Sequence, residues 1–328
     1  MNKTKQNKLS PQTRSDFITY GIVLVAFLVL QPMKMAGLLS SSLSGLLVPI
    51  CAYVVMAISL NLTVGVLGEL SLGHAGFMSV GAFSGVVAAA MMESTVSSAP
   101  LRLFFAIVIG GLIAGVAGFV IGIPVLRLRG DYLAIVTLAF GEIIKNIINC
   151  LYVGFDSQGL HIGMQDSVSL GMEQGGRVLI NGPVGAVGVA KLSSFTAGFL
   201  LILFSLVVVL NMKRSRTGRA IMAVRDNRIA AESVGIPITR YKMTAFITSA
   251  ILAGMAGVLF AMNYTSLIAS KFDFNTSILV LVFVVLGGMG NIRGSIIATV
   301  VLYILPEMLR GLDDFRMLIY AIVLIAVM

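Results

Sequence analysis

The stretch MKRSRTGRAIMAVRDNRIAAESVGIPITRYK, residues 212–242, is a long polar segment in a very apolar chain. It contains eight Lys or Arg residues and two acidic residues. Because Lys and Arg accumulate in the cytoplasmic connections of membrane proteins, the stretch predicts a cytoplasmic loop. Asp226 or Asn227 can cap a short helix within it, and Gly235 followed by Pro237 can end one. We expect a rigid helical element on which a soluble partner docks.

The composition indicates a membrane protein. Hydrophobic residues make up 58% of the 328 residues, charged residues make up 11%, and the mean hydropathy is +1.00. Soluble domains carry about a quarter charged residues. A net charge of +9 is compatible with nucleic-acid binding, but the cations lie in connections between apolar runs, without an aromatic-rich basic patch. Membrane orientation explains the charge better, and we expect surrounding lipid and no nucleic-acid partner.

Apolar runs divide the chain into candidate membrane segments. A helix needs about 20 apolar residues to cross the hydrocarbon core. The candidates are 17–33, 46–66, 69–92, 103–126, 132–153, 195–212, 243–263, 274–290, 294–309 and 315–328. When they alternate from a cytoplasmic N-terminus, 15 of the 23 Lys and Arg residues fall on the cytoplasmic side. The sequence predicts an all-α, polytopic transmembrane helical bundle of about 8–10 membrane segments.

Three connections complete the predicted organisation. Residues 1–16 form a cytoplasmic N-terminal tail, and residues 17–328 form one transmembrane domain with a cytoplasmic loop at 213–242. The connection 154–194 is rich in Gly and polar residues, so we expect it to cap the outer face. Segments 274–290 and 294–309 either span fully or form a re-entrant hairpin, and the short last run suggests a truncated C-terminus.

Small residues predict close helix contacts and an internal repeat. Pairs such as Gly81/Gly85 and Gly111/Gly115 have the spacing that lets helix backbones approach in a membrane. AIVIGGLIAGVAG (106–118) resembles AFITSAILAGMAG (245–257) at an offset of 139 residues. The two runs point in opposite directions in this topology, which favours an inverted repeat relating segments around 103–153 and 243–290.

Polar residues at membrane depth are candidates for a translocation pathway. Glu142 lies near the centre of segment 132–153, with Lys145 one turn on and Asn146 beside it. A charge at a helix centre costs roughly 2.5–3.5 kcal/mol on insertion scales, so the two residues either pair structurally or line a route. The run GELSLGHAGFMSVGAF (68–83) interrupts an apolar region and needs shelter from lipid. Its candidates are Ser71, Gly73 and His74, although a lone His is typical of a structural hydrogen bond.

No constellation for catalysis or metal binding is recognisable. His74 and His161, like Cys51 and Cys150, lack metal-site spacing. A disulfide between the two cysteines remains open, and small core residues are the simpler interpretation. HExxH, GxSxG and GxxxxGK[ST] do not occur. The sequence therefore predicts no enzyme, no cofactor, no metal and no ATP site of its own.

Four stretches resemble one family in its own order. They are LSLGHAGFMSVGAF (70–83), LRGDYLAIVTLAFGEI (128–143), TGRAIMAVRDNRIAAESVGI (217–236) and LGGMGNIRGSIIA (286–298). With the hydropathy profile, they cover most of the chain from about residue 46 onward. The chain resembles the M-type (LivM-like) permease subunits of bacterial ABC importers for branched-chain amino acids.

The resemblance implies a complex in the bacterial inner membrane. Its other members are a paralogous H-type permease, two cytoplasmic ATP-binding subunits and a periplasmic substrate-binding protein. The part of the loop that resembles an ATPase-coupling segment includes Thr217, Gly218, Arg219, Arg225, Asp226, Asn227, Ala230, Ala231, Glu232, Gly235 and Pro237. The importer signature has Glu-Ala-Ala before a Gly, whereas this sequence has Ala-Ala-Glu before Gly235. That difference leaves the individual ATPase contacts open.

The function implied is ATP-driven translocation of Leu, Ile or Val, with hydrolysis by the partner subunits. The preferred amino acid is not readable from the sequence. One alternative is a permease for urea or short amides in the same family. Another is a secondary transporter powered by an ion gradient through Glu142 and Lys145, which leaves the basic loop unexplained.

Overall fold

The computed structural model describes residues 11–128, 130–156, 159–166, 170–172, 176–309, 318–319, 321–322 and 325. Most of the predicted N-terminal tail and most of the predicted segment 315–328 lie outside the described residues. The other predicted membrane segments and candidate site residues lie almost entirely within the described residues.

The elements follow the apolar runs of the sequence. The α-helices are α1 (Pro11–Met35), α2 (Ser41–Asn61), α3 (His74–Met91), α4 (Ala99–Val125), α5 (Asp131–Asn149), α6 (Phe195–Arg214), α7 (Arg216–Asp226), α8 (Arg228–Ser233), α9 (Ile238–Ala261), α10 (Phe274–Leu286) and α11 (Ile292–Met308). A π-helix, η1 (Leu62–Leu67), continues α2, and short 3-10 turns form η2 (Gly182–Val184) and η3 (Ala269–Phe272). The strands are β1 (Tyr152–Asp156), β2 (Gly159–Gly163), β3 (Arg177–Asn181), β4 (Ala186–Val187) and β5 (Ser266–Leu267).

The predicted helical bundle is confirmed. Nine of the ten predicted segments coincide with α1 to α6 and α9 to α11. In the described chain, seven helical stretches are long and apolar enough to cross a membrane: α1, α2 with η1, α3, α4, α6, α9, and η3 with α10. The two remaining predicted segments correspond to α5, which carries Glu142 and Lys145, and to α11, which has 17 residues.

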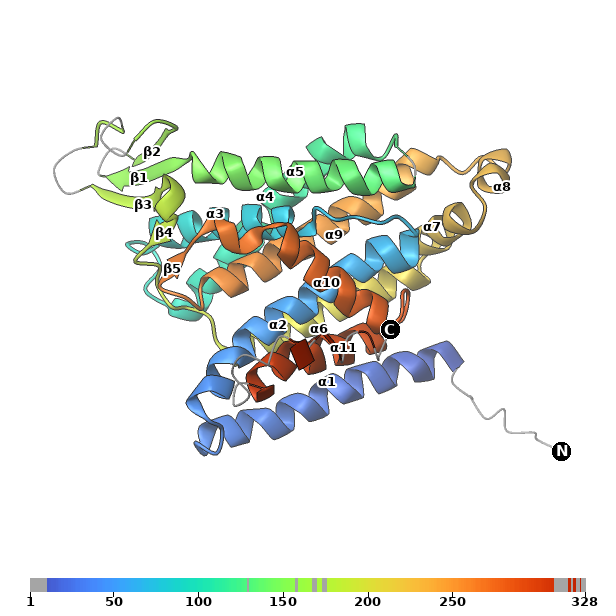
Figure 1. Ribbon diagram of the computed structural model, residues 1–328, viewed down its shortest axis with the longest axis horizontal. Coiled ribbons are helices and arrows are strands. Elements are labelled where there is room, and N and C mark those ends of the chain that lie inside the picture. Colours follow the sequence, from blue (N-terminus) through green and yellow to red (C-terminus); the bar gives the residue numbers. More distant parts are fainter. Residues whose placement is uncertain are drawn as a thin grey trace.

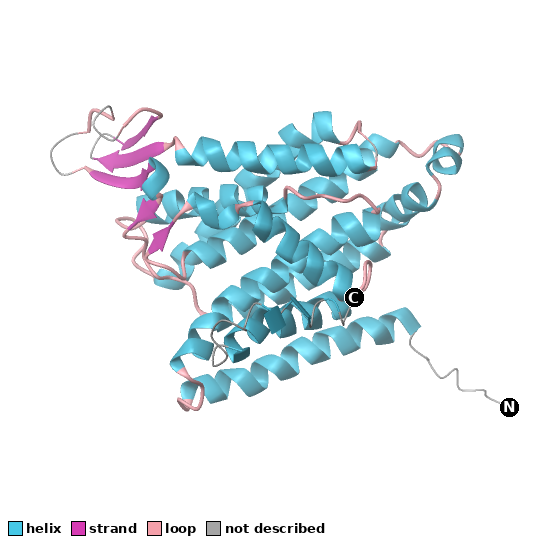
Figure 2. Cartoon of the chain, viewed as in Figure 1, coloured by secondary structure: helices cyan, strands magenta, loops and turns pink. Residues whose placement is uncertain are grey.

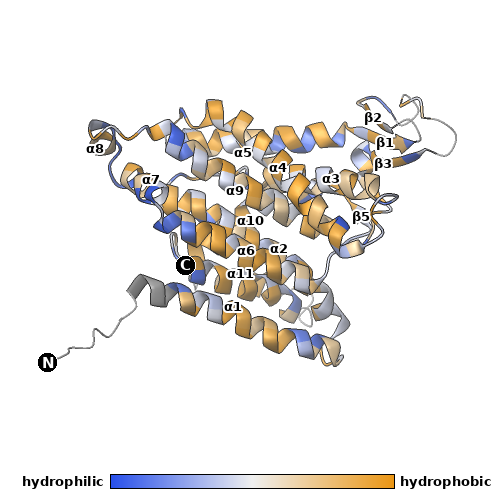
Figure 3. Ribbon diagram, turned by 180° about the vertical axis from the view of Figure 1, so that it is seen from behind, coloured by the Kyte–Doolittle hydropathy of each residue, from blue (hydrophilic) through white to orange (hydrophobic). Residues whose placement is uncertain are grey.

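The bundle has two distinct ends (Figure 1). The strands lie at one of them, here called the sheet end, and α7 and α8 project from the opposite one, here called the basic end. The start of α1 is also at the basic end, because Asp16 forms an ion pair with Arg214 at the end of α6. Apolar residues cover the helices between the two ends, and hydrophilic residues gather around α7 (Figure 3).

A sheet caps one end of the bundle (Figure 2). Its strand order is β2-β1-β3-β4-β5, and all the pairings are antiparallel. Residues 154–194 were expected to cap the outer face, and the sheet within this cap is a structural finding that the all-α prediction did not include. Its inward side chains, including Val153 and Ile180, are buried against the helices. The pairing of β4 with β5 ties the connection after α9 to this cap.

Small residues let α9 lie at the centre of the bundle, in contact with α2, α3 and α4. A Cβ atom on Gly81 of α3 would collide with the backbone of Gly254 on α9. Likewise, a Cβ on Gly110 of α4 would lie 2.7 Å from the carbonyl oxygen of Gly81. The predicted close packing through glycine is therefore found where α3, α4 and α9 meet.

The succession of elements repeats in inverted orientation. α2, a non-helical break, α3 and α4 correspond to α9, a second break, α10 and α11. α2 and α9 are antiparallel, because Ser59 contacts Ser249 while Tyr53, earlier in α2, contacts Phe260, later in α9. This succession pairs α4 with α11, whereas the predicted offset of 139 residues pairs α4 with α9. The inversion itself agrees with the sequence, and the offset differs.

We expect Gly81→Val to destabilise the bundle, because the added side chain must displace the α9 backbone. Overpacking of this kind costs about 1–3 kcal/mol. Thermal stability of the detergent-solubilised protein, measured by the loss of the monodisperse chromatographic peak on heating, should fall. Gly21→Val is the matched control, since no atom lies within 4 Å of a Cβ at that position. Equal melting temperatures for the two variants would contradict the proposed contact.

Candidate functional site

The first break in the membrane helices lies between η1 and α3. η1 ends at Gly68, which has a left-handed backbone with φ 78°, and α3 begins at His74. The backbone N–H groups freed by the break find side-chain acceptors. The Leu72 N–H donates to Thr137 Oγ1 at 3.0 Å, and the Ala75 N–H donates to Ser277 Oγ at 3.1 Å. This satisfies the requirement that backbone groups at membrane depth have partners.

The predicted pathway residues of this break occupy different environments. A Cβ on Gly73 would collide with the Thr137 carbonyl, so the glycine allows the start of α3 to lie against α5. His74 is buried, and its Nε2 lies 2.9 Å from Ser59 Oγ and 3.2 Å from Ser249 Oγ. This position between α2 and α9 agrees with a structural hydrogen bond. Ser71 is also buried, and its Oγ has no hydrogen-bond partner among the described residues.

Glu142 and Lys145 form an ion pair on α5, and both side chains are partly exposed. The second carboxylate oxygen of Glu142 accepts a hydrogen bond from the backbone N–H of Phe274 at 3.2 Å. Phe274 is the first residue of α10, where the helix dipole favours a negative charge. Asn146 is exposed next to the pair. The structure therefore joins the predicted polar residues of α5 to the start of α10, a contact that the sequence did not indicate.

A second break precedes α10. Between α9 and α10 the chain passes through β5 and η3, and Asp273 then caps α10 by accepting from the Thr276 N–H at 3.0 Å. α3 and α10 thus begin beside each other, joined by the Ala75–Ser277 hydrogen bond, and run to opposite ends of the bundle. The sequence predicted that this helix begins at residue 274, but it did not predict that the helix begins beside α3. Discontinuous helices that meet in this way are found at the substrate sites of several transporter folds.

α5 lies at one edge of the bundle, with α1 at the opposite edge (Figure 1). Large side chains of α5 remain exposed, among them Tyr132 and Ile135, with 73% and 61% of their surfaces accessible. The Glu142–Lys145 pair lies on this same helix. The Glu142–Lys145 pair thus lies on an edge helix, and the described residues cover its side chains only in part.

The polar loop at the basic end forms two short helices, α7 and α8, whereas the sequence predicted one short helix. Ser215 caps α7 by accepting from the Gly218 N–H at 3.0 Å, and Asn227 caps α8 by accepting from the Ala230 N–H at 3.0 Å. Gly235, with φ 80°, follows the end of α8. Gly218 is buried against the end of α6, whereas Thr217 and Arg219 are partly or fully exposed.

α8 presents an apolar surface to solvent. Ile229 and Val234 have 80% and 74% of their surfaces exposed, although they belong to a polar loop. Around them Ala230, Glu232, Gly235 and Pro237 are also exposed, while Ala231 is buried. Ile229 of α8 and Val234, which directly follows the helix, thus leave two large apolar side chains exposed in the polar loop.

Arg225, a residue of the predicted coupling segment, also contacts the membrane helices. Its Nη1 donates to the Gly65 carbonyl at 2.9 Å, while its Nε and Nη2 donate to Asp226 Oδ1 at 3.0 and 2.8 Å. The guanidinium therefore links α7 to η1, and Asp226 accepts hydrogen bonds from it. Two further cations of this region, Lys213 and Lys242, also contact the bundle.

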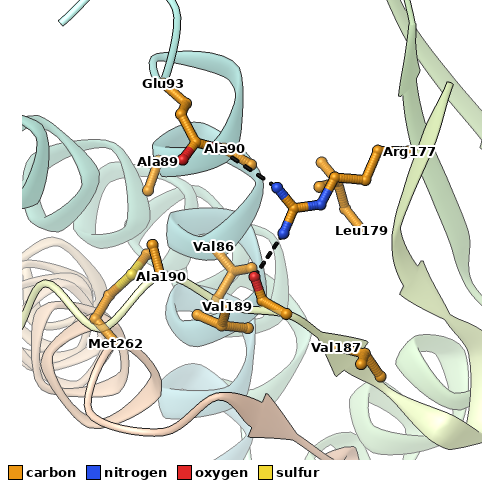
Figure 4. A pocket seen from close by; sticks show the side chains of 11 residues that line it. Val86, Ala89, Ala90, Glu93, Arg177, Leu179, Val187, Val189, Ala190 and Met262 are labelled. Carbon is orange, nitrogen blue, oxygen red and sulfur yellow. Dashed lines mark hydrogen bonds and ion pairs between the residues drawn. The ribbon is translucent and has the colours of Figure 1, made fainter. Parts of the chain in front are cut away.

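At the sheet end, Arg177 of β3 connects the cap to α3 (Figure 4). Its Nη2 donates to the Gly188 carbonyl at 2.7 Å, and its Nη1 lies 3.5 Å from Glu93, just beyond α3. Glu93 also pairs with Arg102 at 3.7 Å. Sequence reasoning missed this cluster, because its members come from two separate connections and from α4.

Cys51 and Cys150 are free; Cys51 is buried in α2 and Cys150 is exposed. Within the described ranges, no group of three His, Cys, Asp or Glu residues gathers as a ligand set for a metal ion.

Comparisons with known proteins give a consistent picture. The family described as "Branched-chain amino acid transport system / permease component" matches residues 42–328. The high-affinity branched-chain amino acid transport system permease protein LivM of Salmonella typhimurium is 35% identical over 277 residues, which cover 81% of this chain and 63% of the relative. LivM of Escherichia coli is 35% identical over 276 residues, with the same coverage.

A more distant relative is the L-arabinose ABC transporter permease protein AraH of Azospirillum brasilense, 28% identical over 278 residues, or 84% of this chain and 73% of the relative. No solved structure matches the chain. The chain spans less than two thirds of the length of the two LivM proteins, 63% in each case. The family match nevertheless covers both breaks, α5 and the polar loop, so this multi-pass membrane protein belongs to the family of permease components of branched-chain amino acid transport systems.

Proposed function

We propose that this protein is the permease subunit of an ATP-driven importer that carries branched-chain amino acids across the bacterial inner membrane. The observation that carries the proposal is the exposed apolar surface of α8 on a basic loop that is bonded to the broken membrane spans. The LivM relatives are named for branched-chain amino acid transport, and they support the choice of substrate. ATP hydrolysis then belongs to separate ATP-binding subunits.

The basic end is the cytoplasmic end in this proposal. The polar loop at 213–242 carries most of its charge as Lys and Arg, and such residues favour the cytoplasmic side. The start of α1 lies at the same end, held by the Asp16–Arg214 ion pair. The N-terminus is then cytoplasmic, and the sheet end faces the periplasm, where a substrate-binding protein delivers the amino acid.

α8 is the element that docks on an ATP-binding subunit. Ile229 and Val234 provide the apolar contact, and the surrounding polar and small residues form its rim. Of the residues that resemble the coupling segment, Ala230, Glu232 and Gly235 are exposed on this surface. Arg225 bonds both Asp226 and the Gly65 carbonyl of η1, so we assign Arg225 a role in positioning the loop on the bundle.

A related permease of the H-type covers the exposed side of α5. The Glu142–Lys145 pair, Asn146 and the start of α10 would then border a route between the two permeases. Amino acids are zwitterions, so a paired cation and anion at membrane depth suit both of their charged groups. Closing and opening of this interface would alternate as the ATP-binding subunits approach and separate.

The same ion pair also favours a second candidate, a secondary transporter driven by Na⁺ or H⁺. Urea or short amides as substrates remain an alternative within the importer class. The secondary-transport candidate gives the exposed side chains of α8 no role.

Reconstituted uptake separates the two classes. We expect leucine uptake into proteoliposomes to require ATP and the two ATP-binding subunits, and to persist when ionophores collapse the cation gradients. Uptake by this chain alone, driven by a cation gradient, would instead establish secondary transport. Competition with isoleucine, valine and urea in the same assay defines the substrate class.

The docking surface is tested by Ile229→Asp combined with Val234→Asp. Because the change buries two carboxylates in an apolar contact, we expect association with the ATP-binding subunits to weaken about tenfold or more in a pull-down from solubilised membranes. Leu38→Asp is the control, since Leu38 is 73% exposed at the far end of α1. Undiminished binding of the double variant would argue against docking through α8.

We expect Glu142→Gln to lower the transport rate about tenfold while expression and assembly stay normal, because the neutral amide leaves Lys145 without its counter-ion. Initial rates of leucine uptake in proteoliposomes measure the effect. Asp131→Asn, an exposed acid in the first turn of the same helix, is the control. A transport rate equal to that of the unchanged protein would reduce the Glu142–Lys145 pair to a structural contact.

A further inference from the structure

Residues 62–73, here called the hinge segment, comprise η1 and the break that leads into α3. Arg225 of α7 lies across this segment. Besides the hydrogen bond to the Gly65 carbonyl at 2.9 Å, its hydrocarbon chain covers the site where Gly68 would carry a side chain. Any Cβ at Gly68 would collide with Arg225, and Gly68 also has φ 78°. The absence of a side chain at Gly68 thus leaves the space that Arg225 occupies against the hinge segment.

A second contact joins the polar loop to the same segment. Lys242, at the start of α9, forms an ion pair with Glu69. The side chains are only 8% and 17% exposed, so the pair is largely removed from water. The Glu69 N–H donates to the Thr63 carbonyl at 3.1 Å, which holds the carboxylate-bearing residue against η1. Removing one partner of a buried ion pair leaves the other charge uncompensated, so a pair of this kind is a firm connection.

The polar loop also reaches the turn between α10 and α11. Lys213 Nζ donates to the Gly290 carbonyl at 3.1 Å, and the Gly290 N–H donates to Asn61 Oδ1 at 2.9 Å. A Cβ on Gly65 would collide with Gly290, so the hinge segment and this turn touch through their backbones. Lys213, Arg225 and Lys242 therefore contact the two broken spans where the hinge segment meets the turn between α10 and α11.

At its other end the hinge segment contacts α5. Leu72 donates to Thr137 Oγ1, and Gly73 lies against the carbonyl of the same threonine. Thr137 is on α5, five residues before Glu142. A continuous series of contacts thus runs from α7, through the hinge segment, to the helix that carries the polar pair.

We propose that the Lys242–Glu69 ion pair and the Arg225–Gly65 hydrogen bond transmit the displacement of α7 and α8 to the hinge segment, and through it to α5. The inference rests on the proposed function and adds positioning residues to it. In this inference, the side chains of Lys242, Glu69 and Arg225 touch neither the amino acid nor the ATP-binding subunit. Removing these contacts uncouples ATP hydrolysis from the movement of the membrane spans. The ATP-binding subunits still dock on α8 and hydrolyse ATP, but the membrane spans no longer follow.

The test uses the complete complex in proteoliposomes, with binding protein and labelled leucine. We expect Lys242→Met and Glu69→Gln each to lower the leucine taken up per ATP hydrolysed about tenfold or more, while association with the ATP-binding subunits and basal hydrolysis are unchanged. The reversed pair, Glu69→Lys with Lys242→Glu, and the conservative Lys242→Arg should restore most of the coupling. Arg240→Gln, an exposed cation in the first turn of the same helix, is the control.

Arg225→Ala is a second probe that does not depend on the buried pair, since Arg225 is an exposed residue. It should uncouple uptake from hydrolysis in the same manner. A normal ratio of uptake to hydrolysis in Arg225→Ala and Lys242→Met would overturn the inference and leave the importer function intact. Loss of subunit association in these variants would also overturn it, because the residues would then act in docking. Uptake by the unchanged complex without ATP would refute the proposed function itself.

Discussion

The structure depends on one constraint: a backbone that leaves the helical conformation at membrane depth must find partners for its polar groups inside the protein. Two spans of this chain break, before α3 and before α10. Thr137 and Ser277 accept hydrogen bonds from the start of α3, and Glu142 accepts one from the start of α10. Because each partner lies on another helix, satisfying the two breaks also fixes how α3, α5 and α10 meet.

This arrangement places two segments outside the α-helices, the hinge segment and the turn at residues 287–291, beside a densely packed group of helices. The glycine-mediated contact of α3, α4 and α9 is dense, and displacing it is costly. The hinge segment and the turn at residues 287–291 are joined to the helices around them by hydrogen bonds and one ion pair, from Asn61, Lys213, Arg225 and Lys242, in addition to the buried apolar side chains of η1. In the importer that we propose, a force applied to α8 would enter the membrane through these contacts. The route passes through exchangeable polar contacts, which suits alternation between outward-open and inward-open arrangements.

Local features of the structure were predictable, and non-local ones were not. Helix positions follow from runs of apolar residues, and the ends of α8 follow from Asn227 and Gly235, because hydropathy and capping act over a few residues. The sheet was missed, since Ala186 pairs with Leu267 across a long separation in sequence. The direction of Arg225 was also not predictable, because a cation in a loop has the same sequence signature whether it faces a partner or its own bundle. The contact between Glu142 and α10 joins residues 132 positions apart.

Side-specific labelling tests most directly whether α7 and α8 receive force on the cytoplasmic side. Single cysteines replace Ile229 or Val234 in a chain whose Cys51 and Cys150 are changed to alanine, and a membrane-impermeant maleimide is applied to intact cells and to inverted vesicles. We expect labelling in inverted vesicles alone, and protection when the ATP-binding subunits are bound. Labelling of either position in intact cells would place α8 in the periplasm and contradict the central claim.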